Sequence, residues 1–240
     1  MRFTVNNSGF AYDVEIPDVQ VRRIHRPLVA RFHQAAAGGR AVIMVAGPPA
    51  SGKTMLCAVW QQIADAERLS FVTLAMDGFH FPNAYLAERD LAKRKGSPET
   101  FDVRSMTIAL AQINAGTPTV WPLYDRNLHE PVAEGVGIDE QKVVVIEGNY
   151  FLLDEPHWAS LRRYATLTVR LDVDRDCLRE RIVERHVRGG MSRQKAEDKF
   201  RESDLHNIVL VKERSVEADI VLLQDAKGSF RLLAGGGRSL

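Results

Sequence analysis

The stretch that decides the fold is Ala41-Val42-Ile43-Met44-Val45-Ala46 followed by Gly47-Pro48-Pro49-Ala50-Ser51-Gly52-Lys53-Thr54. The first part is apolar and rich in β-branched side chains, as expected of a strand that is covered on both faces. The second part matches the pattern G-x-x-x-x-G-K-[ST], in which glycines permit a tight loop and backbone N–H groups surround phosphate oxygens at the start of a helix. The sequence therefore predicts a strand, a phosphate-binding loop and a helix in direct succession.

Two side chains of this loop have predicted roles toward a nucleoside triphosphate. Lys53 is long enough to reach the β- and γ-phosphates, and the Thr54 hydroxyl is a ligand for Mg²⁺. The residues expected to hold the nucleotide are Gly47, Pro48, Pro49, Ala50, Ser51, Gly52, Lys53 and Thr54. We therefore expect a nucleoside triphosphate and Mg²⁺ as cofactors.

Further short apolar runs follow along the chain, at residues 71–76, 143–146, 167–171 and 219–223. Helical periodicity separates several of them, over residues 54–68, 105–115 and 175–188. Strands that alternate with helices indicate βαβ units, so the predicted fold is α/β, a parallel sheet flanked by helices. Residues 83–136 are richer in Gly, Pro and charge, and there we expect loops and one helix over the sheet edge.

Residues 1–39 form an extension ahead of the first sheet strand. Residues 1–16 are typical of short strands around a turn at Asn6-Asn7-Ser8-Gly9, and a helix over residues 18–37 follows, in which Pro27 introduces a bend. This helix either packs on the core or forms the contact of a homodimer. We expect a single domain over residues 1–240, with Gly235-Gly236-Gly237 in a frayed tail.

Composition argues against several classes of function. The chain has 240 residues, 45% hydrophobic and 26% charged, and its 32 Lys and Arg against 31 Asp and Glu leave a net charge of +1. A nucleic-acid or membrane-surface binder is therefore not indicated. No run of about 18 apolar residues and no apolar leader are visible, so we expect a cytoplasmic protein without a membrane span. Cys57 and Cys177 lie in apolar helical contexts and are predicted to be buried thiols.

Motifs narrow the class of nucleotide-binding protein. The guanine motif N-K-x-D and the transporter motif L-S-G-G-Q are both absent, which favours ATP and a small-molecule kinase. Such a kinase brings a hydroxyl acceptor to the γ-phosphate, with a carboxylate to orient or deprotonate it. Asp77 follows the second predicted strand and suits this role. Glu147 ends the third strand, where an acid supports Mg²⁺, and Asp77 is near enough in the predicted sheet to share the metal with Glu147 and Thr54.

Five segments carry a family resemblance, in family order over residues 40–220, and they are GPPASGKT, MDGFHFPN, RKGSPETFDV, PLYDRNLHEP and VVVIEGNYFLL. With these segments the sequence resembles the P-loop small-molecule kinases that include uridine kinase, phosphoribulokinase and bacterial type I pantothenate kinase. It resembles in particular bacterial proteins described as fructose-transport-system kinases. The resemblance implies a three-layer P-loop kinase fold with a helical lid.

The resemblance also implies an acceptor site. Asp102 matches an acid that binds acceptor hydroxyls in the uridine kinases, and Tyr124 and His129 keep the family's Y-x-x-x-x-H spacing in the acceptor loop. On the residues alone, Tyr124 would also fit an aromatic core and His129 an ordinary surface. This sequence departs from the family by having Arg126 and Asn127 within the loop. Extra polar groups there suit a hydroxyl-rich or anionic acceptor better than a nucleobase.

A basic helix is predicted over residues 175–188. Arg181, Arg185 and Arg188 are spaced i, i+4 and i+7, so they share one helical face. We expect a lid over about residues 175–205 whose arginines, with Arg185 assigned as catalytic, neutralise charge in the transition state. The alternative is a salt-bridged surface helix, because Glu184 lies four residues before Arg188.

The sequence thus predicts an ATP- and Mg²⁺-dependent kinase that phosphorylates a small hydroxylated metabolite. A sugar is the first choice of acceptor, and pantothenate or a nucleoside is the runner-up. The competing class is a nucleotide-dependent regulatory protein that hydrolyses ATP slowly. The predicted acceptor residues favour the kinase, because a regulatory switch has no need of an acceptor pocket.

Overall fold

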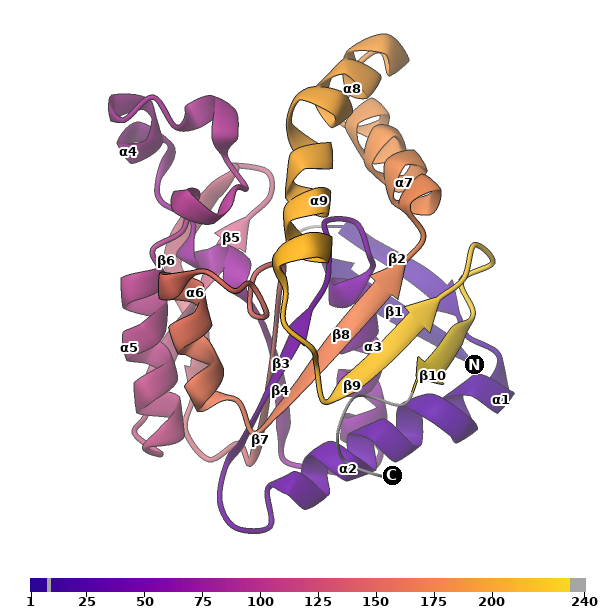
Figure 1. The fold of residues 1–240 in the computed structure, drawn as a ribbon. Coiled ribbons are helices and arrows are strands. Elements are labelled where there is room, and N and C mark those ends of the chain that lie inside the picture. Colours follow the sequence, from indigo (N-terminus) through magenta and orange to yellow (C-terminus); the bar gives the residue numbers. More distant parts are fainter. Residues whose placement is uncertain (8–9, 234–240) are drawn as a thin grey trace.

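The computed structural model describes residues 1–7 and 10–233, and a six-stranded sheet lies at its centre (Figure 1). The strands lie in the order β10-β9-β8-β3-β7-β4. All neighbouring pairs of this sheet are parallel except β10 with β9. The strands are β3 (Ala41–Ala46), β4 (Phe71–Ala75), β7 (Val143–Gly148), β8 (Leu167–Val173), β9 (Ile220–Gln224) and β10 (Phe230–Leu233).

Strand β3 lies in the middle of the sheet, and all six of its residues are buried. It pairs on one side with β7, where Ala46 is opposite Gly148, and on the other side with β8, where Ala46 is opposite Arg170. Because the following strands lie to both sides of β3, the topology switches direction at this strand. Ligands of open parallel sheets bind beyond the carboxyl ends of the strands at such a switch point.

Helices cover both faces of the sheet, as the predicted layers require. Ile43 and Val45 of β3 face a core shared with α2, α3 and α7, whereas Val42 and Met44 face a second core shared with α5 and α9. This alternation is the period of two that a strand dictates. The helices are α1 (Asp18–Gln20), α2 (Arg26–Ala35), α3 (Lys53–Ala66), α4 (Asn83–Glu88), α5 (Val103–Asn114), α6 (Pro156–Ala159), α7 (Arg175–Arg188), α8 (Arg193–Lys199) and α9 (Leu205–Arg214).

The N-terminal residues form an antiparallel hairpin of β1 (Arg2–Asn7) and β2 (Phe10–Glu15). It lies on α3, where the Gln62 amide donates to the Thr4 carbonyl at 2.7 Å. The predicted hairpin is therefore present, although Ser8 and Gly9 of the predicted turn lie outside the described residues, as does the predicted tail at 235–237.

The N-terminal helix packs on the core. Phe32 of α2 is fully buried, and its ring meets that of Trp60 edge to face at a centroid distance of 5.2 Å. A π-helical turn, Val21–His25, joins α1 to α2 just before Pro27. Proline has no N–H to donate to the carbonyl four residues earlier, and a local widening of the helix next to it fits that loss.

Residues 83–136 contain more regular structure than the sequence predicts. Besides the expected helix α5, they form a second hairpin of β5 (Thr119–Asp125) and β6 (Glu130–Ile138). Prolines within both strands obscure the strand pattern, and the register shifts at Pro122. The hairpin lies directly on the turn after β4, since a Cβ at Gly78 would come within 2.0 Å of the Pro122 carbonyl oxygen.

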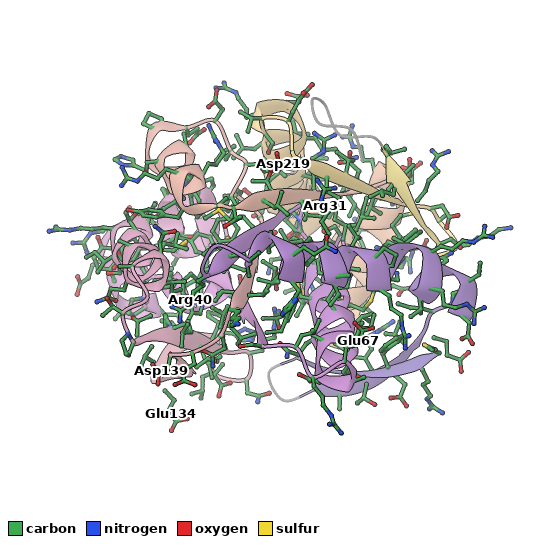
Figure 2. The ribbon with its side chains drawn as sticks, turned by 90° about the horizontal axis from the view of Figure 1, so that it is seen from below. Arg31, Arg40, Glu67, Glu134, Asp139 and Asp219 are labelled. Carbon is green, nitrogen blue, oxygen red and sulfur yellow. The ribbon has the colours of Figure 1, made fainter. Side chains whose placement is uncertain are left out.

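The side chains of Arg40 and Asp219 lie at the amino ends of the strands (Figure 2) and make hydrogen bonds there. Arg40, between α2 and β3, donates to the carbonyl oxygens of Gln141 and Ile113 at 2.7 and 3.0 Å. Asp219 accepts from the backbone and the hydroxyl of Thr168 at 2.8 and 2.7 Å. The open end of the sheet is therefore the carboxyl end, from which α7 and α8 project (Figure 1).

The predictions about membrane spans and about the two cysteines can be compared with the structure. None of the helices within residues 1–7 and 10–233 is both long and apolar enough to cross a membrane. Cys57 is buried in α3, and burial raises the pKa of its thiol. Cys177 is only half-buried, because it lies near the exposed start of α7, so the prediction of a buried thiol is wrong for this residue.

Candidate active site

The phosphate-loop sequence forms the turn between β3 and α3. Gly52 has φ +93°, a left-handed conformation that side chains rarely adopt, and α3 begins at the next residue. A Cβ at Gly47 would lie 2.7 Å from the Leu171 carbonyl oxygen of β8. Both glycines are thus needed for the loop to fit, and the predicted succession of strand, loop and helix is present.

The Lys53 ammonium lies in a nest of oxygen atoms within the loop. It donates to the carbonyl oxygens of Gly47 at 2.9 Å and Pro48 at 3.0 Å, and to Oδ1 of Asn149 at 2.8 Å. Burial lowers the pKa of Lys53, and the Glu147 carboxylate opposes this. Asn149 was not among the predicted site residues, although it follows the end of β7 one residue after Gly148.

Thr54 and Glu147 are in contact, as expected for residues that share a metal. The Thr54 hydroxyl donates to Oε1 of Glu147 at 2.7 Å. Glu147 is only 7% exposed, and burial raises its pKa while the charge of Lys53 lowers it. Within the described ranges no group of three or more His, Cys, Asp and Glu side chains could hold a metal alone. Oxygen donors in this small number fit Mg²⁺, which uses few carboxylates and completes its shell with phosphates and water.

Asp77 lies in the 3₁₀ turn that follows β4. Nη2 of Arg126 donates to its Oδ2 at 3.2 Å, and each side chain is about one-third exposed. Both residues line a cavity of about 180 Å³ together with Thr54, Tyr124 and Glu147. Burial, with the charge of Asp77 adding to it, raises the pKa of Tyr124 to about 12. Four of the predicted site residues therefore surround one space.

Asp102 lies apart from this cavity. Its carboxylate caps α5, accepting from the backbone N–H of Ser105 at 2.9 Å and from the Ser105 hydroxyl at 2.6 Å. The residue borders a separate groove of about 800 Å³ that also contains Trp158 and Asn207. The structure thus does not bring Asp102 together with Asp77, and a helix cap explains its present contacts.

His129 is exposed in the turn between β5 and β6, outside the cavity of Asp77. Its φ of +53° is unusual for a residue with a side chain. The backbone carbonyl, rather than the imidazole, makes its contacts: it accepts from Nζ of Lys95 at 2.5 Å and from the Asn83 amide at 3.2 Å. The hairpin turn is held in this way by the segment around α4.

The arginines of α7 differ in their surroundings. Nη1 of Arg181 donates to Oε1 of Gln224 at 2.9 Å and reaches the carbonyl oxygens of Ala50 and Ser51 at 3.4 Å. This arginine therefore ties α7 directly to the phosphate loop. The spacing of the arginines predicted the helix face on which Arg181 lies. Its contact with the phosphate loop was not predicted, because it depends on how α7 packs against the loop.

The charged side chains in the last turns of α7 contact Asp204, a neighbouring glutamate or solvent. Nε2 of His186 and Oδ2 of Asp204 are 2.9 Å apart, and Nη2 of Arg185 lies 4.0 Å from the other oxygen. Arg185 is half-exposed, at the end of the helix nearer α8. Arg188 pairs with Glu184 at 3.2 Å on the surface, which is the alternative that the spacing allowed for this residue.

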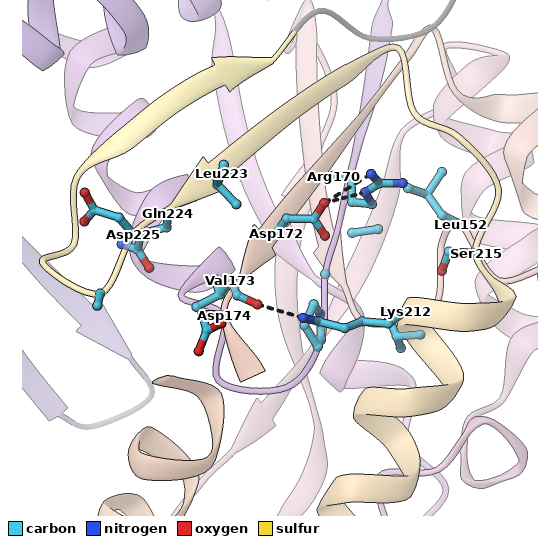
Figure 3. Close-up of a pocket in the computed structure, with 15 residues that line it drawn as sticks. Leu152, Arg170, Asp172, Val173, Asp174, Lys212, Ser215, Leu223, Gln224 and Asp225 are labelled. Carbon is cyan, nitrogen blue, oxygen red and sulfur yellow. Dashed lines mark hydrogen bonds and ion pairs between the residues drawn. The ribbon is translucent and has the colours of Figure 1, made fainter. Parts of the chain in front are cut away.

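A second cavity, of about 620 Å³, lies at the carboxyl ends of β8 and β9 (Figure 3). Arg170 and Asp172 are two residues apart on β8 and form an ion pair at 3.1 Å in its lining, and Nζ of Lys212 donates to the Val173 carbonyl at 2.9 Å. Gly47 belongs to its lining. Because β8 and β4 lie on opposite sides of β3, the phosphate loop stands between this cavity and that of Asp77.

Comparison with known proteins gives the site its context. The sequence of Escherichia coli strain K12 YggC, whose name assigns no activity, is 32% identical over 235 residues, covering 96% of this chain and 98% of that one. A provisionally named uridine kinase of Schizosaccharomyces pombe is 27% identical, covering 89% of this chain and 95% of that one. The crystal structure of a provisionally named fructose transport system kinase from Silicibacter sp. TM1040 superposes with a TM-score of 0.74 at 29% identity, covering 80% of this chain and 98% of that one.

The family model for the phosphoribulokinase / uridine kinase family matches residues 42–222. The match runs from β3, ahead of the phosphate loop, to β9, the last parallel strand of the sheet. It therefore spans the cavity of Asp77 and most of the second cavity, and Gln224 lies just beyond its end. This chain belongs to the phosphoribulokinase/uridine kinase family and is an ATP-dependent small-molecule kinase.

Proposed function

We propose that this chain transfers the γ-phosphoryl group of ATP, with Mg²⁺ bound, to a hydroxyl of a small metabolite, with a sugar as the favoured acceptor. The supporting observation is that Thr54, in the phosphate loop, also lines the cavity of Asp77 and Tyr124. A phosphate held by the loop and a hydroxyl held in this cavity would be neighbours. The small volume of the cavity, the polar side chains of Asp77, Tyr124 and Arg126 in its lining, and the name of the Silicibacter relative favour a sugar.

The phosphate loop would hold the nucleotide through its backbone N–H groups and Lys53. In doing so, the Lys53 ammonium exchanges its loop carbonyls and Asn149 for the β- and γ-phosphates. Thr54, Glu147 and Asp77 are the residues that would hold Mg²⁺. The metal supplies neutralisation of phosphate charge when it is bound.

The chemical step is a substitution at phosphorus. The acceptor oxygen forms a bond to the γ-phosphorus, and the bond from that phosphorus to the β–γ bridging oxygen breaks, so ADP leaves. The hydroxyl proton passes to the Asp77 carboxylate, which acts as general base. Arg185 would face the transferred group from α7 and stabilise its negative charge.

The three residues proposed for acceptor binding differ in how close they lie to the cavity of Asp77. Tyr124 already lines the cavity beside Asp77. Asp102 must leave its helix cap, and His129 must turn inward from the hairpin, before either can touch an acceptor in that cavity. We further propose that residues 1–240 form one kinase domain and that residues 175–205 are its lid, which Arg181 tethers to the loop.

Two other acceptors and one other class of function remain as alternatives. A nucleoside would agree with the name of the Schizosaccharomyces relative, and pantothenate with the resemblance of the sequence. A regulatory ATPase would need no acceptor. The test is ADP release with a panel of sugars, vitamins and nucleosides, with the phosphorylated products identified by mass. If no compound raises ADP release above the rate without acceptor, the regulatory ATPase is favoured and this proposal fails.

A further inference from the structure

The cavity of Asp77 contains one strongly basic side chain whose donors are mostly unused by the protein. Nη2 of Arg126 donates to Asp77, and no other hydrogen bond of this guanidinium occurs within the part of the chain that the structure describes. A guanidinium carries five N–H donors in a planar fork. The other donors of Arg126 are therefore left for water or for a ligand.

The guanidinium faces the same space as the groups proposed for chemistry. Arg126 lines the cavity with Tyr124 and Glu147. Its side chain is 31% exposed, so most of it is covered by the protein.

The turn that carries Arg126 is held in place before any ligand arrives. Oδ1 of Asp125 accepts the backbone N–H groups of Asn127 at 2.7 Å and Leu128 at 3.0 Å, and Lys95 binds the His129 carbonyl. A recognition group on an ordered turn loses little conformational freedom on binding. An arginine with free donors on such a turn is suited to a carboxylate or a phosphate, whose oxygens match its fork.

We propose that Arg126 determines the specificity of the acceptor site, and that the acceptor is a short hydroxylated carbon chain that bears a carboxylate or a phosphate. This inference rests on the proposed function and narrows its acceptor from small hydroxylated metabolites in general to sugar acids, other hydroxy acids and sugar phosphates. The anionic group binds the free donors of Arg126 while the hydroxyl faces Asp77. Because Arg126 and Asp77 are in contact, the two groups of the acceptor lie only a few bonds apart.

The test compares matched acceptors that differ only in charge. One arm pairs glycerate with glycerol, ribonate with ribose, and gluconate with glucose; the other pairs ribose 5-phosphate with ribose and glucose 6-phosphate with glucose. We expect kcat/KM to favour the charged member of at least one pair by about 10–10²-fold, the effect of one charge-assisted hydrogen bond. The arm in which the preference appears identifies the anion as carboxylate or phosphate.

Variants of Arg126 then separate recognition from structure. Arg126→Gln should remove this preference by raising the KM of the charged acceptor at least tenfold more than that of its neutral partner, and Arg126→Lys should retain part of it. Arg23→Gln, at an exposed arginine of the N-terminal helix, is the matched control and should keep the preference. Equal losses for charged and neutral acceptors would show that Arg126 only positions Asp77, and the inference would be wrong.

Binding measurements keep this inference distinct from the proposed function. The same compounds are titrated calorimetrically into the protein with ADP and Mg²⁺ present. If none is phosphorylated, the proposed function fails for these acceptors, but anions that bind the parent and not Arg126→Gln still support the role of Arg126. If charged and neutral compounds bind the parent alike, the inference is overturned whatever the turnover data show.

Discussion

The Lys53 ammonium and the Asn149 side-chain carbonyl meet at 2.8 Å, at the point where the ends of β3 and β7 lie side by side. This contact joins the phosphate loop to the strand that carries Glu147. Lysine is in place before any nucleotide is present, and its oxygen partners are of the kind that a phosphate replaces. Loop and acid are therefore positioned by the same pair of neighbouring strands.

Replacing Lys53 by alanine should abolish phosphoryl transfer and weaken ATP binding, because it removes the charge that faces the β- and γ-phosphates. Most of its present partners are loop oxygens rather than core side chains, so the variant should stay folded. Turnover and ATP affinity are measured beside a thermal melt. A variant that turns over at the parental rate would contradict the assignment of the loop, and one that unfolds would reveal a structural role for the lysine.

Two substitutions of Asp102 should have different effects on the free energy of unfolding but similar effects on acceptor binding. Asp102→Ala removes the cap of α5 and should lower the free energy of unfolding by about 1 kcal/mol, whereas Asp102→Asn keeps a capping oxygen and should cost much less. Both variants lose the charge proposed to bind acceptor hydroxyls. The acceptor KM should therefore rise by about 10–10²-fold in both, while the KM for ATP changes little.

Denaturant unfolding and steady-state kinetics of the two variants decide between these roles. If Asp102→Asn has the parental acceptor KM, the carboxylate is a helix cap and nothing more. If alanine costs no stability, the capping contact with Ser105 contributes little in solution. The asparagine variant is the control for the alanine variant in each comparison.

The sequence predicted those features of the site that depend on local order along the chain. Asp77 and Glu147 were found because each follows an apolar run that ends a strand, and parallel strands bring their carboxyl ends to one edge. The phosphate loop was found because its glycines and its lysine have fixed spacing. Each of these signals lies within a few consecutive residues.

What the sequence did not predict depends on contacts between distant segments. Arg126 contacts Asp77 although the two are 49 residues apart in the sequence. Arg126 lies on a hairpin whose prolines obscure the strand pattern. The contact between Asn149 and Lys53 exists because β7 lies beside β3, and no local pattern in the sequence indicates it. Asp102 is different: its spacing of three from Ser105 was a local capping signal, but the resemblance to the uridine kinases drew attention to the acceptor instead.

His25 should make stability depend on pH. The imidazole is fully buried, with Nδ1 accepting from Nε1 of Trp60 at 3.3 Å and Nε2 without a partner among the described residues. Burial lowers its pKa to about 4. In the unfolded chain the pKa returns to about 6.5, so below this value the unfolded state binds more protons and stability falls as pH drops toward 4.

The expected loss from this histidine between about pH 7 and about pH 5 is about 2 kcal/mol of unfolding free energy. Urea unfolding of the parent and of His25→Gln at both values measures it, since glutamine can still accept from Trp60 but does not titrate. The variant should lose less stability than the parent on acidification. An identical pH dependence in the two proteins would show that His25 is not buried as a neutral group.

Asp77→Asn separates transfer from nucleotide binding. The amide is nearly isosteric, and its oxygen can still accept from Arg126, so the packing of the cavity should survive. It cannot take the proton of the acceptor, and general-base contributions are typically about 10²–10⁴-fold, so kcat should fall within that range. ATP affinity should stay within a few-fold of the parent. If Asp77 also holds Mg²⁺ beside Glu147, the concentration of metal needed for half-maximal rate should rise as well.

Acceptor phosphorylation and acceptor-free ATP hydrolysis are measured side by side across a magnesium titration. The proposed mechanism requires transfer to collapse while nucleotide affinity is preserved, because the carboxylate acts on the acceptor rather than on ATP. A loss of both at all metal concentrations would place Asp77 in nucleotide or metal binding alone. Undiminished transfer would leave Asp77 as the partner of Arg126 and no more, and a different group in the cavity would have to take the proton.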